Sequence, residues 1–126
     1  VYPRGYDKNL FDDSAHSSVP QINDVCAKRL NRLSEYCAKK NAVLLVSGFP
    51  IMQRSGEVLD RSEYENFQTN LAEKLDCRII SDFTDYIYDE SLFYNTNLHL
   101  TNAGAEIRTK QLINDLKKYF GSEQKN

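Results

Sequence analysis

Apolar residues recur at helical spacing in the first third of the chain, with lysine and arginine on the opposite side. This spacing predicts an amphipathic helix that ends near residues 40–41. Ser17 or Ser18 is expected to cap the helix, and Pro20 suits its first turn. The apolar face of this helix is expected to consist of Ile22, Val25, Cys26, Leu30, Leu33 and Cys37.

Two further helices are predicted from the same kind of pattern. Ser62 and Glu65 form a Ser-x-x-Glu capping box, which predicts that a helix starts at Ser62. The last helix is expected to begin after Thr101, to run to about Phe120 and to stop at Gly121. The buried stripe of the middle helix should consist of Tyr64, Phe67, Leu71 and Leu75, and one side of the last helix of Ile107, Leu112, Ile113, Leu116 and Phe120.

The continuous apolar run "AVLLVSGF" at residues 42–49 is typical of a strand that is buried on both faces. The segment "CRIIS" at residues 77–81 predicts a second, short strand. Residues 50–61, which contain a proline and a glycine, are expected to form a loop. Residues 82–97 are expected to form a loop or a short helical turn.

The elements over residues 19–121 follow the order helix, strand, helix, strand, loop, helix, and residues 1–18 are expected to form a loop or arm before them. This alternation predicts an α/β fold with parallel strands. Residues 1–126 are therefore either a single α/β domain or the C-terminal part of one. A parallel sheet is normally covered on both faces and has about five strands. We therefore expect a missing N-terminal segment or a partner chain to complete the sheet.

The composition is that of an ordinary globular protein, with 40% hydrophobic and 27% charged residues in a chain of 126. A net charge of −2 argues against a dedicated nucleic-acid partner. No apolar run approaches the roughly 20 residues that a membrane-spanning helix needs, so no membrane span is expected. Neither a cofactor nor a structural zinc is expected, because Cys26, Cys37 and Cys77 form no C-x-x-C arrangement. These cysteines are expected to be small buried apolar residues.

The candidate chemistry centres on "FYNTNLHLTNAG", residues 93–104, which contains His99 just before the last helix. In an open parallel sheet, reactive groups gather at the carboxyl ends of the strands, where this loop is expected to lie. Histidine is the side chain whose unperturbed pKa lies nearest neutral pH, so it can serve as a general base to a hydroxyl nucleophile. A structural or surface role for His99 is the alternative.

The segment "NTNLHLTNAGAEIRTKQLINDL" resembles the last motif block of the SGNH (GDSL-like) hydrolases, and "LLVSGFPIM" is similar to a late core strand and its Pro-containing turn. The resemblance covers roughly residues 20–120 and is most specific at 93–116. It implies a three-layer, doubly wound parallel sheet of the flavodoxin-like SGNH type, with its C-terminal half in this chain. The motif positions are occupied by Asn95, Thr96, Asn97, Leu98, His99, Leu100 and Gly104.

The resemblance also implies an esterase or acyltransferase that acts on O-acyl esters, glycan-linked ones included, at a bacterial cell envelope. His99 matches the catalytic base. The acid that orients this base stands three residues earlier in most members, at Thr96 here, and four residues earlier in the most similar branch, at Asn95 here. Neither side chain carries the negative charge that stabilises an imidazolium. The compartment itself is left open, with an extracytoplasmic one favoured.

The nucleophile and the oxyanion-hole residues of the family are not recognisable in the chain. Ser47 follows a late strand but does not lie in a Gly-x-Ser-x-Gly turn, and Ser14, Ser17 and Ser18 belong to the opening segment. Whether the chain is an enzyme is therefore left open. The alternative is a non-catalytic SGNH-like pseudoenzyme, or a module that binds a carbohydrate or a partner.

Three further features of the sequence each allow two interpretations. His16 with Asp12 and Asp13 either binds a metal or belongs to a solvated loop. Asp82 either supplies the missing acid or caps a strand end. The aromatic and acidic residues of 85–94 either line a sugar-binding cleft or pack under a long loop.

Overall fold

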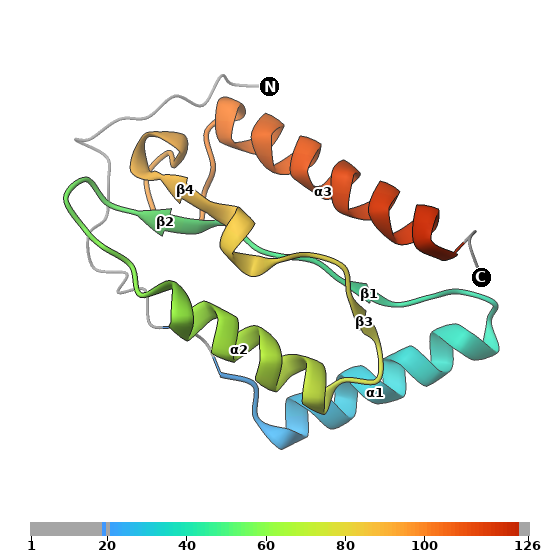
Figure 1. The fold of residues 1–126 in the computed structure, drawn as a ribbon. Coiled ribbons are helices and arrows are strands. Elements are labelled where there is room, and N and C mark those ends of the chain that lie inside the picture. The colour runs from blue at the N-terminus through green and yellow to red at the C-terminus, as the bar shows by residue number, and fades with distance from the viewer. Residues whose placement is uncertain (1–18, 20, 124–126) are drawn as a thin grey trace.

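The computed structural model describes residues 19 and 21–123, with three α-helices and two pairs of short parallel strands (Figure 1). The prediction of an α/β fold with parallel strands is confirmed in this form. The predictions that rest on His16, Ser17, Ser18 and Pro20 lie outside the described residues. In chain order the elements are α1 Asp24–Lys39, β1 Leu45–Val46, β2 Ile51–Gln53, α2 Arg61–Lys74, β3 Arg78–Ile79, the 3₁₀ turn η2 Phe83–Tyr86, β4 Ile87–Asp89, the 3₁₀ turn η3 Glu90–Leu92, and α3 Asn102–Glu123.

The strands form two consecutive parallel pairs along one ribbon. β1 pairs with β3 and places Leu45 opposite Arg78, an offset of 33 residues. β2 pairs with β4 and places Ile51 opposite Ile87, an offset of 36 residues. The chain from β3 to β4 therefore contains three more residues than the chain from β1 to β2. The 3₁₀ turn η2 accommodates them, because it shortens the path of the chain relative to a strand.

Two of these strands lie where loops were predicted. β2 lies within residues 50–61 and β4 within residues 82–97, so both loop predictions are wrong at those positions. Each strand has only three residues, and proline precedes the first of them. Such short segments show no clear alternation of apolar and polar residues. They are stabilised as strands by pairing with each other, although they are distant in the sequence.

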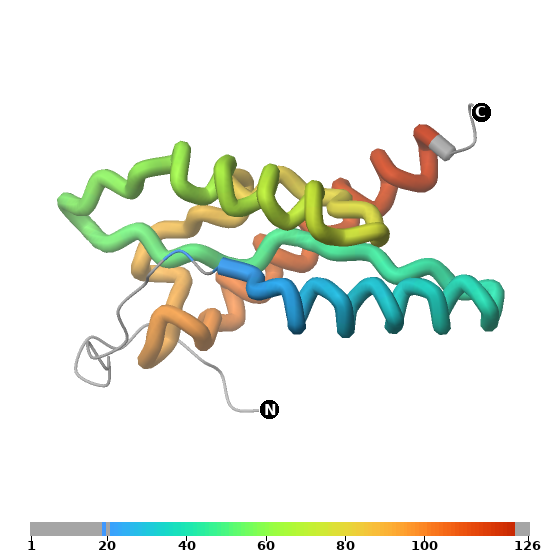
Figure 2. The backbone as a smooth tube through the Cα atoms, turned by 90° about the horizontal axis from the view of Figure 1, so that it is seen from below, coloured from blue at the N-terminus to red at the C-terminus, as the bar shows by residue number. Residues whose placement is uncertain are grey.

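Helices cover both faces of the ribbon. α1 and α2 lie on one side and α3 on the other, and the view from below in Figure 2 agrees with that in Figure 1. The apolar core is correspondingly divided into two clusters. The cluster of buried residues under α1 and α2 consists of Ala27, Leu71, Leu75, Cys77 and Phe83. The second cluster, around β2, β4 and the loop after β4, consists of Met52, Tyr86, Tyr88 and Phe93.

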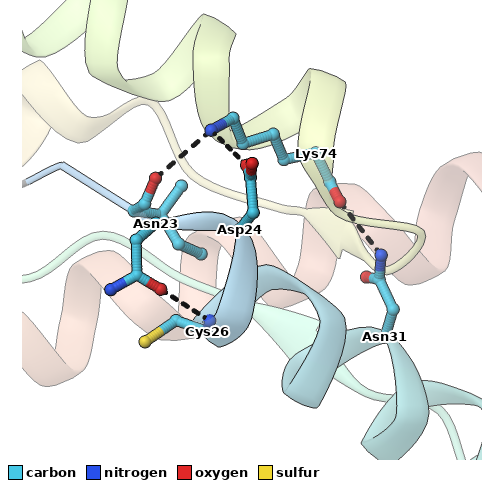
Figure 3. A network of polar contacts seen from close by, with 6 residues as sticks. Asn23, Asp24, Cys26, Asn31 and Lys74 are labelled. Atoms are coloured by element: carbon cyan, nitrogen blue, oxygen red, sulfur yellow. Dashed lines mark hydrogen bonds and ion pairs between the residues drawn. The ribbon is translucent and has the colours of Figure 1, made fainter.

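A polar network fixes the start of α1 against the end of α2 (Figure 3). Lys74 Nζ lies 2.9 Å from Asp24 Oδ1, and this contact lowers the pKa of the Asp24 carboxyl. The Asn31 side chain makes two hydrogen bonds to the backbone at the end of α2. Its amide nitrogen donates to Lys74 O at 3.0 Å, and its Oδ1 accepts from Asp76 N at 2.9 Å. The helix pair is therefore tied at the backbone as well as through its apolar contacts.

One end of each helix differs from the prediction, whereas the end of α1 near residue 40 and the start of α3 after Thr101 are confirmed. α1 begins at Asp24, where Asn23 caps it by accepting from Cys26 N at 2.8 Å, so it starts later than a cap at Ser17 or Ser18 implies. The cap of α2 is Asp60 rather than Ser62. α3 continues through Gly121 to Glu123, so this glycine does not end the helix.

The apolar faces of α1 and α3 are less buried than predicted, whereas Tyr64, Leu71 and Leu75 of the predicted α2 stripe are buried. The exposed residues are Val25, Cys26 and Leu33 on α1, and Ile107, Ile113 and Phe120 on α3. Among the helices of the described residues, none combines the length and the hydrophobicity that crossing a bilayer requires.

Candidate functional site

The loop that carries His99 is closed by backbone hydrogen bonds at its base. Phe93 and Leu100 form an antiparallel bridge, and Tyr94 N donates to His99 O at 2.7 Å. Thr101 N donates to Leu92 O at 2.8 Å, which joins the end of the loop to η3. The loop leaves the carboxyl end of β4 and returns to the start of α3. His99 is therefore held at the carboxyl end of the parallel strands, where the topology predicts reactive groups.

The first turn of α3 anchors the same loop. The Thr101 hydroxyl accepts from Gly104 N at 3.1 Å, and the Thr101 carbonyl accepts from Ala105 N at 2.9 Å. The hydroxyl also donates to Leu92 O at 3.2 Å. A Cβ atom on Gly104 would lie 2.4 Å from this carbonyl oxygen. Glycine is thus required where the helix passes close to the backbone of η3.

The imidazole of His99 is oriented by Asn95. Nδ1 lies 2.9 Å from Asn95 Oδ1, and both residues are accessible on the surface of the loop. Because an amide oxygen only accepts, Nδ1 carries the proton in this pair, and in the neutral imidazole the lone pair is therefore on Nε2. This is the tautomer that a general base needs. It is held here by a neutral amide instead of a carboxylate.

Thr96 has a different place in the loop. Its hydroxyl accepts from Leu98 N at 3.1 Å, and its carbonyl lies 3.4 Å from His99 N as an acceptor. These contacts shape the turn that leads into the histidine. Of the three predicted site residues, the structure therefore brings together His99 and Asn95, and it places Thr96 in the supporting turn.

No serine hydroxyl of the described residues is hydrogen-bonded to His99. Ser47 donates to Gly48 O at 3.4 Å, in the short connection between β1 and β2. Gly48 is itself packed so closely on the Tyr86 ring that a Cβ there would lie 2.3 Å from it. Ser14, Ser17 and Ser18 lie outside the described residues. The described residues thus contain an oriented base but no nucleophile beside it.

The weaker candidates have structural roles in this part of the chain. Asp82 caps η2, because its Oδ1 accepts from Thr84 N at 3.0 Å and from the Thr84 hydroxyl at 2.8 Å. Tyr86, Tyr88 and Phe93 are buried in the second core cluster, as the packing alternative predicted.

The cysteines and the metal-binding residue types give no further site. The three cysteines are free, with Cys26 exposed, Cys37 half-buried and Cys77 buried. Burial raises the pKa of the Cys77 thiol. The expectation of buried cysteines therefore fails for Cys26. Within residues 19 and 21–123, no three metal-ligating side chains are grouped.

One buried polar cluster was not anticipated from the sequence. The Asp115 carboxylate, only 2% exposed, accepts from Ser81 Oγ at 2.6 Å, from Tyr86 OH at 2.8 Å and from Gln111 Nε2 at 3.1 Å. Burial is the main cause that raises the pKa of Tyr86, to about 12. The cluster attaches α3 to the ribbon between β3 and β4. The sequence contained a signal for the burial of Asp115, because this residue lies on the same helix face as Leu112, three residues earlier.

Comparison with known proteins identified no relative of this chain. No protein-family model matches the chain, and neither the curated proteins nor the solved structures gave a match. The class that the fold itself defines is a mixed α/β protein with parallel strand pairs between helices.

Proposed function

We propose that this chain carries the histidine-bearing part of an SGNH-like esterase or acyltransferase that acts on O-acyl esters, including esters on glycans. The observation that supports the proposal is the His99–Asn95 pair, 2.9 Å apart on an accessible loop at the carboxyl end of the parallel strands. The sequence pattern around His99 supports it independently. In this proposal the three-layer SGNH sheet is completed by residues beyond those described.

The proposed chemistry is acyl transfer through a serine. His99 Nε2 takes the proton from a serine hydroxyl as its oxygen attacks the ester carbonyl. The imidazolium then gives this proton to the leaving alcohol, and an acyl-serine remains. Water or a second alcohol accepts the acyl group in the reverse sequence of steps. The serine comes from a further segment of the protein or from a partner chain.

Asn95 limits the rate of this chemistry. It holds the tautomer of His99, but it cannot stabilise the positive charge that the imidazole gains during proton transfer. In a triad on another fold, replacing the carboxylate by an amide lowers kcat about ten-thousandfold. The same observation favours the second candidate, a non-catalytic SGNH-like module that binds a glycan or a protein partner.

Restoring the carboxylate distinguishes the two candidates. In the full-length protein, Asn95→Asp should increase hydrolysis of p-nitrophenyl acetate at least tenfold, because the new carboxylate would lie at the imidazole. Labelling by a fluorophosphonate probe should accelerate in parallel. Thr96→Asp is the matched control, since Thr96 is bonded to the turn and not to the ring. His99→Ala should abolish both readouts.

The opposite outcome is equally informative. If neither the native protein nor Asn95→Asp is labelled or turns over the ester, while circular dichroism shows that both are folded, the esterase proposal is wrong. The binding module is then the better account. If Thr96→Asp activates and Asn95→Asp does not, residue 95 is not the one that orients the His99 imidazole.

A further inference from the structure

The outer face of α1 combines exposed apolar side chains with a concentration of positive charge. Val25 is 59% exposed, Leu33 45% and Tyr36 60%. At helical spacing these three residues lie within one third of the circumference, away from buried Ala27. α1 and α2 face the reader in the view from below in Figure 2. This face of α1 thus lies on the outside of the described molecule.

The charge of this face is opposite in sign to that of the whole chain. Five exposed cations accompany the apolar residues, and Glu35 is the single carboxylate among them, which gives the face a net charge of +4. Asp24, the other acid of α1, is bonded to Lys74. The chain as a whole has a net charge of −2. The five cations are Lys28, Arg29, Arg32, Lys39 and Lys40.

The positions of these cations are not explained by the helix itself. Cations near a helix C-terminus stabilise it through the macrodipole, which accounts for Lys39 and Lys40. Lys28, Arg29 and Arg32 lie in the first and middle turns, where this effect is absent or unfavourable. At helical spacing, Arg29 and Lys40 fall between Tyr36 and Leu33, and Lys40 Nζ lies 5.9 Å from the centre of the Tyr36 ring.

We propose that this face of α1 docks on an anionic lipid bilayer. Basic helices with an apolar strip lie in the interface of such bilayers, where long cationic side chains reach the headgroups while their stems cover apolar surface. A second copy of the chain is a poor partner, because two faces of +4 repel each other. Protein interfaces are depleted in lysine, and three of the five cations here are lysines. The binding is peripheral and does not depend on the esterase chemistry.

Co-sedimentation with vesicles tests the proposal on the full-length protein. One preparation contains equal parts of phosphatidylglycerol and phosphatidylcholine, and the other contains phosphatidylcholine alone. At low salt the protein should bind the anionic vesicles at least tenfold more strongly, and added salt should weaken this binding. Arg29→Glu with Arg32→Glu should reduce the partition coefficient at least tenfold.

A control with the same change in net charge isolates the contribution of α1. Lys117→Glu with Lys118→Glu alters two exposed cations of α3, on the other side of the strands, and should reduce binding less than threefold. Val25→Ser with Tyr36→Ser should weaken binding while its salt dependence remains. Equal losses from both charge reversals, or equal binding to the two vesicle types, would overturn the proposal. Retention on a polyglutamate resin without vesicle binding would also overturn it and would assign the face to an acidic protein.

Discussion

Gly104 lies where the first turn of α3 passes the carbonyl of Leu92, and a Cβ atom has no room there. We expect Gly104→Ala to lower the free energy of unfolding by about 1–2 kcal/mol, because the overpacking exceeds the gain in helix propensity. Denaturant titration measures this change. Gly121 is the matched control, since it lies in the same helix with nothing within 4 Å of a new Cβ. Gly121→Ala should be neutral or stabilising by up to about 1 kcal/mol. Equal effects of the two substitutions would contradict the close contact at Leu92.

Tyr86 and Tyr88 are two buried phenols with opposite hydrogen-bonding states. Tyr86 OH donates to the Asp115 carboxylate at 2.8 Å, whereas Tyr88 OH has no hydrogen-bond partner among the described residues. Removing a bond to a charged group should make Tyr86→Phe cost about 1.5–3 kcal/mol. Tyr88→Phe removes a hydroxyl that is buried without a partner, so it should be neutral or stabilising by up to about 1 kcal/mol. Thermal or denaturant unfolding of the two variants at neutral pH checks the difference, and a larger loss for Tyr88→Phe would contradict it.

The residues of the candidate site were predictable to different degrees. His99 was singled out by its chemistry and Asn95 by the resemblance to a family motif, and their contact is local because they lie four residues apart in one loop. Asp115 was missed because its partners Ser81 and Tyr86 are 34 and 29 residues away in the sequence. A single sequence shows that a polar residue lies on an inward helix face. It does not show which distant hydroxyl groups will meet it.

At the scale of elements, the sequence located the start of α2 but predicted the wrong capping residue. The sequence predicted a cap at Ser62, but the Asp60 side chain accepts from Ser62 N at 3.0 Å and from the Ser62 hydroxyl at 2.6 Å. We expect Asp60→Ala to cost about 1 kcal/mol, since it removes the acceptor of the first turn. Ser62→Ala should cost a few tenths, because Asp60 still caps the backbone. Chemical denaturation of both variants decides between the two caps, and a larger loss for Ser62→Ala would restore the capping box.

The helices were more predictable than the strands for a physical reason. Each helix has at least 14 residues, so its apolar period is repeated several times along the chain. Each strand has two or three residues. Its pairing depends on a neighbour 33 to 36 residues away in the sequence. The apolar runs at 42–49 and 77–81 located β1 and β3, while β2 and β4 became strands only through their contact with each other.

At the scale of the whole molecule, the described residues form a ribbon two strands wide between layers of helices. β1 and β3 are joined by α2, and α1 lies on the same face of the ribbon as α2 (Figure 1). Crossovers between parallel strands are right-handed in nearly all proteins. Successive right-handed crossovers on one face add strands in the same direction. A parallel strand that leads into α1 would therefore lie beside β1 and β2, on the side away from β3 and β4.

This argument predicts which edge of the ribbon is completed if a further strand joins it as proposed. Residues 44–53 would then be a central strand, hydrogen-bonded on both sides, and residues 78–89 would remain an edge strand. Hydrogen exchange in the full-length protein should accordingly be slower at the amides of residues 44–53 than at those of residues 78–89, because exchange from a central strand requires opening of both ladders. Similar exchange in the two segments would mean that neither edge is covered. Slower exchange at residues 78–89 would place the new strand on the opposite edge, and α1 would then not be entered by a right-handed crossover from a neighbouring parallel strand.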